Sequence, residues 1–230
     1  MKLYHGSTVE VAKPMLAKGK PNNDYGRGFY CTEDVEMARE WASKGSEPPA
    51  FVNSYELDLD GLTLLNLADP QYTVLNWIAV LLANRTFDLD SDVAKDVRDY
   101  ITAAFMPPIK KADVVIGYRA DDSYFNYADA FVGNALSLRR LNEALHLGRL
   151  GLQVALRTAK AFENLTFLGA EEVIWDDYHI RYKTRDSEAR MEWAETVKTG
   201  GRAADDTFAV DIIRRGLKHG DPSLREVLPA

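Results

Sequence analysis

The chain has 230 residues, a formal net charge of −7 and a pI of about 5.2. Its length suffices for one full hydrophobic core, and 46% apolar and 27% charged residues are typical of a globular protein. The acidic balance argues against a protein that binds nucleic acid over its whole surface. No run approaches the roughly 18 apolar residues of a membrane span, so no membrane is expected as a partner.

Cysteine and histidine usage limits the chemistry further. The single cysteine, Cys31, excludes an internal disulfide framework and predicts a cytoplasmic protein. Its expected role is that of a small buried apolar residue, because no activating base is evident beside it. Four scattered histidines do not form a zinc-binding pattern, so no metal site is predicted.

The first half of the chain predicts short strands that alternate with helices. Apolar residues at helical spacing follow Thr32, which is the expected N-cap of a helix through Trp41. Period-two alternation predicts a strand over 51–57. The predicted strands are 2–5, 28–31, 51–57 and 62–67, and the predicted helices cover 33–44, 72–83 and 93–105.

The second half continues the same mixture up to Trp175. Strands are predicted over 113–117 and 152–157, helices over 124–133, 136–147 and 158–165, and extended segments over 166–169 and 172–175. Beyond Trp175 the sequence becomes polar, with helical patterns over 186–199 and 208–219. We therefore expect an α+β domain over 1–175, built from two packed antiparallel sheets with flanking helices, and a helical C-terminal extension over 176–230.

Two clusters of basic residues are candidates for anion contacts. Arg139, Arg140 and Arg149 form the first, and Arg181, Lys183 and Arg185 form the second. Solvated surface is the favoured interpretation of both.

The most informative residues lie in the first 41 positions. His5-Gly6-Ser7 lies on the first predicted strand, and Gly26-Arg27-Gly28-Phe29-Tyr30 leads into the second. A glycine lets a ligand approach the backbone closely, and an aromatic ring can stack on a flat heterocycle. Together with Trp41 on the following helix, these residues suit a flat aromatic amide and its ribose, which points to NAD+ used as a substrate.

These motifs resemble the first two motifs of the diphtheria-toxin-like and poly(ADP-ribose) polymerase-like ADP-ribosyltransferases. The segments 113–122 and 152–161 resemble a bacterial domain family of formerly unknown function that belongs to the same superfamily. The resemblance covers residues 1–175 and implies the transferase fold, with NAD+ bound in a cleft between two sheets.

The resemblance also implies roles for individual residues. His5 orients the adenosine-side ribose, and Gly6 holds the nicotinamide carboxamide, with the Ser7 hydroxyl nearby. Tyr30 and Trp41 enclose the nicotinamide ring, and Gly28 permits the sharp turn before the tyrosine strand. Asp122 is expected to face the same cleft, with a helix cap or solvated turn as its alternative role.

The third motif departs from the polymerases, which carry a glutamate on a late strand. The corresponding strand offers Gln153, whose amide can hydrogen-bond ribose hydroxyls but cannot act as a carboxylate base. The resemblance therefore implies mono-ADP-ribosyl transfer, with His5, Tyr30 and Gln153 as the catalytic set. A polar residue on an exposed strand face is the competing interpretation of Gln153. Asp121, Asp122 and Glu172 are alternative carboxylates.

The expected function is transfer of ADP-ribose from NAD+ to a protein or nucleic-acid acceptor. Analogy with small bacterial members suggests a toxin of a toxin–antitoxin or phage-defence system, with an antitoxin protein as a partner. Two alternatives stay open: an NAD+ glycohydrolase that uses water as acceptor, and an inactive module that binds NAD+, ADP-ribose or a protein.

Overall fold

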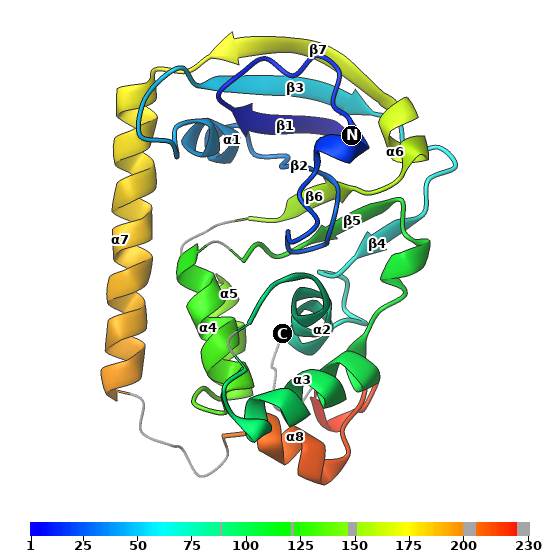
Figure 1. Ribbon diagram of the computed structural model, residues 1–230, viewed down its shortest axis with the longest axis vertical. Coiled ribbons are helices and arrows are strands. Elements are labelled where there is room, and N and C mark those ends of the chain that lie inside the picture. The colour runs from blue at the N-terminus through cyan, green and yellow to red at the C-terminus, as the bar shows by residue number, and fades with distance from the viewer. Residues whose placement is uncertain (88, 121, 147–150, 200–205, 225–230) are drawn as a thin grey trace.

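Figure 1 shows the chain as a computed structural model, which describes residues 1–87, 89–120, 122–146, 151–199 and 206–224. Within these ranges the side chains of residues 122–124, 145, 146, 193 and 196–199 lie outside the description. The expected α+β architecture with two sheets is confirmed. The strands are β1 (Lys2–Ser7), β2 (Phe29–Cys31), β3 (Phe51–Leu57), β4 (Leu64–Asn66), β5 (Val114–Gly117), β6 (Gln153–Leu156) and β7 (Leu165–Glu172).

Helices cover the sheets on several sides (Figure 1). The α-helices are α1 (Val35–Ala42), α2 (Val74–Asn84), α3 (Asp92–Phe105), α4 (Asp122–Val132), α5 (Leu138–His146), α6 (Ala159–Glu163), α7 (Trp175–Thr199) and α8 (Ala209–Arg215). Two short 3₁₀ helices, η1 (Leu16–Lys18) and η2 (Ile109–Lys111), lie in the connections. None of the helices within the described ranges is long and apolar enough to cross a membrane.

The first sheet has three antiparallel strands in the order β1-β3-β7. The central strand β3 carries Asn53 opposite His5 of β1, which fixes the register of the strand that bears the first motif. A register irregularity between Ser54 and Tyr55 interrupts the pairing with β7. Irregularities of this kind bend a strand and increase its twist.

The second sheet has four strands in the order β2-β6-β5-β4. Its β2-β6 and β6-β5 pairs are antiparallel, but β4 pairs with β5 in parallel, so the expectation of two wholly antiparallel sheets is wrong for this pair. The physical reason is the long connection between β4 and β5, which contains α2 and α3. A crossover of this length returns the chain to the sheet in the same direction, as parallel pairing requires.

The two sheets share a dry core that positions the two motifs. Leu3 of β1 and Phe29 of β2 belong to one buried cluster, together with Tyr55 and Leu156. An isolated bridge between Tyr4 and Thr32 joins β1 directly to the end of β2. The His5 strand and the Tyr30 strand are therefore held side by side, although 25 residues separate the two motif residues.

A second core lies beneath the four-stranded sheet, around α2. This helix is apolar on nearly every side, and its residues from Val74 to Leu82 are buried, as expected of a helix in the middle of a helical layer. Asn76 is the polar member of the run, and its Nδ2 donates to the carbonyl of Phe105 at 2.7 Å. Ile212 of α8 and Leu224 belong to the same buried cluster, so C-terminal residues contribute to this core.

Helix α7 stands beside both layers (Figure 1) and is joined to α1 by ion pairs. Arg185 lies 2.7 Å from Glu40, and Arg181 lies 3.0 Å from Glu36. These two arginines therefore pair with acids of α1, which corrects the expectation of a wholly solvated cluster. In the first basic cluster, Arg139 pairs with Asp206 at 2.9 Å, and Arg149 lies outside the described residues.

Two expected element boundaries are wrong. Thr32 is not the N-cap of α1, because its backbone pairs with Tyr4 and stays extended. Asp34 caps the helix instead, and its carboxylate accepts hydrogen bonds from the backbone N–H groups of Glu36 and Met37. Trp175 is not extended either; it is the first residue of α7.

Candidate functional site

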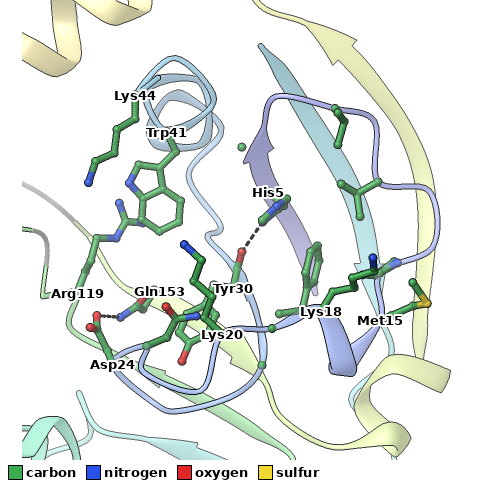
Figure 2. Close-up of a pocket in the computed structure, with 18 of the residues that line it drawn as sticks. His5, Met15, Lys18, Lys20, Asp24, Tyr30, Trp41, Lys44, Arg119 and Gln153 are labelled. Atoms are coloured by element: carbon green, nitrogen blue, oxygen red, sulfur yellow. Dashed lines mark hydrogen bonds between the residues drawn. The ribbon is translucent and has the colours of Figure 1, made fainter. Parts of the chain in front are cut away.

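A cavity of about 850 Å³ opens at the place where β1, β2 and β6 approach α1 (Figure 2). Its wall is completed by the connection 8–24 and by the residues that follow β5. Six of the residues that the sequence suggested line it together: His5, Gly6, Gly28, Tyr30, Trp41 and Gln153.

The other suggested residues are placed differently. Ser7 is not among the lining residues, and its hydroxyl accepts a local hydrogen bond from the backbone of Val9 at 3.3 Å. Asp122 is the first residue of α4, but its side chain lies outside the described residues, as does Asp121. Glu172 is exposed at the end of β7 and does not line the cavity.

His5 is fixed by its neighbour on β2. Its Nδ1 lies 2.7 Å from the carbonyl oxygen of Tyr30 (Figure 2). A carbonyl can only accept, so Nδ1 carries the proton and Nε2 of the neutral ring is an acceptor. Burial lowers the pKa of the imidazole below its usual value and outweighs the carbonyl of Tyr30, which raises it. His5 thus offers an acceptor to the cavity at neutral pH.

Tyr30 presents a ring to the cavity, while its hydroxyl is occupied. The hydroxyl donates to the carbonyl of Gly26 at 2.6 Å and accepts from the backbone N–H of Tyr25 at 3.0 Å. These bonds close the turn around Gly26, whose φ of 78° lies in the region that favours glycine. Burial raises the pKa of Tyr30, so the phenol stays protonated. Stacking, rather than proton transfer, is the chemistry available to this side chain.

Trp41 lines the cavity from α1, but one of its faces is covered. The guanidinium carbon of Arg119 lies 3.0 Å from the centroid of the tryptophan ring. Arg119 follows β5 and is itself buried. A ligand can therefore stack only on the other face of Trp41, a restriction that the motif alone does not reveal.

Gly6 is needed for the packing of α1 against β1. A Cβ atom added there would lie 2.1 Å from the carbonyl oxygen of Ala38 and 2.5 Å from the nitrogen of Ala42. Only glycine lets α1 approach β1 this closely. The same close approach brings Trp41 to the cavity.

Gln153 is buried on β6, with 3% of its surface exposed, so the interpretation as an exposed strand residue is wrong. Its Nε2 donates to Oδ2 of Asp24 at 2.7 Å and to the carbonyl oxygen of Tyr118 at 3.1 Å. Both partners are acceptors, so the orientation of the amide is fixed and both of its N–H groups are used. The oxygen Oε1 is left as the acceptor that Gln153 can offer to a ligand.

Asp24 is the important residue that the sequence reading missed. Its carboxylate also accepts from the backbone N–H of Ala120 at 2.9 Å and pairs with Arg85 at 3.2 Å. Burial raises the pKa of the carboxyl, although the hydrogen bonds and the neighbouring arginines act in the opposite direction. The surrounding Pro-Asn-Asn-Asp sequence is typical of an exposed turn, so the local pattern gave no signal of burial.

Cys31 is buried, and burial raises its pKa, which confirms the expected apolar role. Within the described ranges no three histidine, cysteine, aspartate or glutamate side chains lie close enough together to hold a metal ion.

Comparisons with known proteins give one result. Neither a search of curated proteins nor one of solved structures returns a significant match. A family described as "Protein of unknown function (DUF3990)" matches residues 1–167, which contain every cavity residue discussed above. The match spans more than half of the chain, and the protein therefore belongs to the DUF3990 family.

Proposed function

We propose that this protein cleaves NAD+ and transfers the ADP-ribosyl group to a macromolecular acceptor. The observation that carries the proposal is the convergence of His5, Tyr30 and Gln153 on one cavity, beside Trp41. These residues come from three strands and a helix, and β6 lies more than 100 positions after the other three elements. The resemblance of their motifs to those of ADP-ribosyltransferases supplies the chemistry.

In the proposed reaction the bond between ribose C1′ and the nicotinamide nitrogen breaks, and nicotinamide leaves with the electron pair. An oxygen or nitrogen of the acceptor then bonds to C1′ and loses one proton to solvent. The transition state has oxocarbenium character, as in glycoside cleavage. The enzyme must therefore hold the ribose while charge develops at C1′.

Each cavity residue has a task in this scheme. Oε1 of Gln153 accepts from a hydroxyl of the nicotinamide ribose, and Nε2 of His5 accepts from a hydroxyl of the adenosine ribose. Tyr30 stacks on the nicotinamide ring, and the face of Trp41 that Arg119 does not cover closes the pocket. Because Gln153 is neutral, it cannot deprotonate an acceptor hydroxyl, so we propose a single transfer without chain elongation.

A role as a bacterial toxin controlled by an antitoxin is part of the proposal by analogy alone.

The macromolecule that accepts the ADP-ribosyl group is to be identified by experiment. The protein should be incubated with NAD+ labelled in its adenine moiety and with a cell lysate, and the products digested with protease or nuclease. Label that survives protease and is lost with nuclease identifies a nucleic acid; the converse identifies a protein.

The matched variants are Gln153→Ala and Gln71→Ala, since Gln71 is exposed and does not line the cavity. We expect label transfer to be lost only in the first. Free ADP-ribose without labelled macromolecule would replace the proposal with NAD+ hydrolysis. Binding of NAD+ without nicotinamide release would replace it with a binding module.

A further inference from the structure

The cavity has the opposite charge balance from the rest of the chain. Among the described residues, six with basic and two with acidic side chains line it, whereas the whole chain carries a net charge of −7. The lining residues with charged side chains are Glu10, Lys13, Lys18, Lys20, Asp24, Lys44, Arg85 and Arg119. A basic cavity in an acidic protein attracts an anionic ligand to one place on the surface.

Three of these basic residues come from one connection, 8–24. Lys13, Lys18 and Lys20 are exposed, and we refer to them as the lysine rim. Within the described ranges none of the three forms an ion pair. By contrast, Arg85 pairs with Asp24, and Arg119 lies on Trp41. Lys44, the sixth basic residue, lies over the ring of Tyr182 at 5.8 Å. The rim thus provides three exposed cationic groups at the cavity.

The connection that carries the lysine rim is fixed by hydrogen bonds to β3 and to Arg27. Oδ1 of the buried Asn53 accepts from the backbone N–H of Val11 at 2.7 Å, and the hydroxyl of Tyr55 donates to the carbonyl of Val11 at 2.6 Å. Arg27 donates to the carbonyl of Gly19 at 2.9 Å, between Lys18 and Lys20. A frame that is ordered before binding reduces the entropy lost when a ligand arrives.

The rim and the proposed nucleoside site belong to one cavity. In Figure 2 Lys20 extends toward the space between His5 and Trp41, which places an ammonium group beside the residues assigned to the riboses. Lysine ammonium groups are common ligands of phosphate oxygens. The anion that suits this arrangement is a phosphate group attached to a nucleoside.

We propose that Lys13, Lys18 and Lys20 bind the diphosphate group of a nucleotide substrate. The proposal rests on the proposed function for the identity of that nucleotide as NAD+, while the anion site itself is independent of catalysis. Phosphate chemistry of the same kind could be presented by the backbone of a nucleic-acid acceptor. The test therefore uses inorganic pyrophosphate, ADP-ribose and a single-stranded oligonucleotide as separate probes.

The experiment compares the full chain with the variant Lys18→Gln/Lys20→Gln by calorimetry. The matched control is Lys110→Gln/Lys111→Gln, because these two lysines are also exposed and close in sequence but do not line the cavity. We expect pyrophosphate and ADP-ribose to bind about tenfold more weakly to the rim variant only, since two partly exposed ion pairs together amount to roughly that factor. The salt dependence of binding should also decrease.

Each outcome decides the proposal. Weaker ADP-ribose binding in the rim variant alone supports it, with the dinucleotide as the source of the phosphates. An oligonucleotide that binds more tightly than ADP-ribose, and loses affinity in the same variant, overturns the diphosphate assignment in favour of a nucleic-acid backbone. Unchanged affinity for all three probes, or no binding of any probe at millimolar concentration, overturns it. If binding depends on the rim but NAD+ is never cleaved, the proposed function fails and the anion site stands.

Discussion

The side-chain amide nitrogen of Gln153 lies 2.7 Å from Oδ2 of Asp24, although 129 positions separate the two residues. This bond joins β6 to the connection that precedes β2. It also gives the uncharged side chain of Gln153 a fixed orientation. Asp24 accepts at the amide nitrogen, so the amide oxygen of Gln153 is available to a ligand, as a carboxylate oxygen of glutamate would be.

The first prediction concerns the restoration of a glutamate. Gln153→Glu introduces the glutamate that the polymerases carry, but it also places two carboxylates at hydrogen-bond distance from each other. We expect the variant to be about 1–3 kcal/mol less stable at neutral pH, with the deficit reduced at acidic pH, where the pair shares a proton. Urea unfolding at several pH values measures this.

The exchanged pair Asp24→Asn/Gln153→Glu is the control for that prediction. It replaces two facing carboxylates by an amide and a carboxylate, which removes the repulsion. The new amide also faces the backbone N–H of Ala120, and the new carboxylate faces the carbonyl of Tyr118, so only part of the lost stability should return. Gln71→Glu, on the surface, should have almost no effect. If Gln153→Glu alone were as stable as the exchanged pair at neutral pH, the contact between Asp24 and Gln153 would be refuted.

The second prediction is the pH dependence of the reaction. The ionised carboxylate of Asp24 orients Gln153, and burial raises the pKa of Asp24. As the pH falls, this carboxyl gains a proton earlier than an ordinary aspartate does. The rate of nicotinamide release should therefore fall on the acidic side with a midpoint above 3.8, the usual pKa of an aspartate.

Asp24→Asn is the variant that tests the origin of this acidic limb. Asparagine keeps a carbonyl oxygen that can accept from Gln153 and Ala120, as Oδ2 of Asp24 does, and its amide nitrogen then faces Arg85. We expect the rate at neutral pH to fall only a few-fold, because Gln153 keeps its orientation. The acidic limb due to Asp24 should also disappear. An unchanged pH–rate profile would argue against the role of Asp24.

The third prediction concerns the protonation of His5. Its pKa is lowered in the folded protein, so the unfolded chain binds a proton first as the pH falls through 6.5, the usual histidine value. Stability should therefore decrease as the pH falls through this region. The decrease should be smaller in His5→Gln, whereas His179→Gln leaves this contribution in place. Denaturant unfolding at about pH 7.5, 6.5 and 5.5, on both sides of the usual histidine pKa, measures the difference.

The fourth prediction tests the close packing of α1 on β1. Gly6→Ala should lower the free energy of unfolding by about 1–3 kcal/mol or more, because the added carbon overlaps the backbone of Ala38. Gly45→Ala is the matched control, since the atom nearest to its added carbon is the carbonyl oxygen of Glu47, 3.8 Å away. Equal stabilities of the two variants in urea unfolding would show that α1 does not approach β1 this closely.

The fifth prediction separates the ring of Tyr30 from its hydroxyl. Tyr30→Phe keeps the ring but removes the hydrogen bonds to Gly26 and Tyr25. We expect a loss of about 1–3 kcal/mol in stability, while nicotinamide release at saturating NAD+ stays within a few-fold of the wild-type rate. Tyr30→Ala should abolish release. A loss of activity in Tyr30→Phe as large as in Tyr30→Ala would point to a role of the hydroxyl in the reaction.

Much of the fold follows from local patterns. The alternation over 51–57 predicts β3 with the bounds that the structure has, because the strand is flanked by turn-forming residues. Pattern alone did not reveal the parallel pairing of β4 with β5, which depends on a crossover of two helices. It also did not predict the burial of Asn53. This polar side chain of β3 is buried because it forms a hydrogen bond with the connection 8–24.

The candidate site divides in a similar way. His5, Tyr30, Trp41 and Gln153 could be selected from the sequence because their motifs resemble a known set. Asp24 and Arg119 could not, because each acquires its position from a loop that folds onto distant strands and α1. Burial of a charged loop residue is a tertiary property, and no local periodicity encodes it.

The most direct test of the central claim is nicotinamide release from NAD+ by the purified protein with lysate as acceptor source. The comparison is between wild type, Gln153→Ala and the surface control Gln71→Ala. We predict that wild type and Gln71→Ala release nicotinamide at equal rates and that Gln153→Ala is at least about tenfold slower, as expected for loss of a hydrogen bond to the transition state. Equal rates in all three proteins, or no release by the wild type, would contradict the assignment of this cavity to NAD+ cleavage.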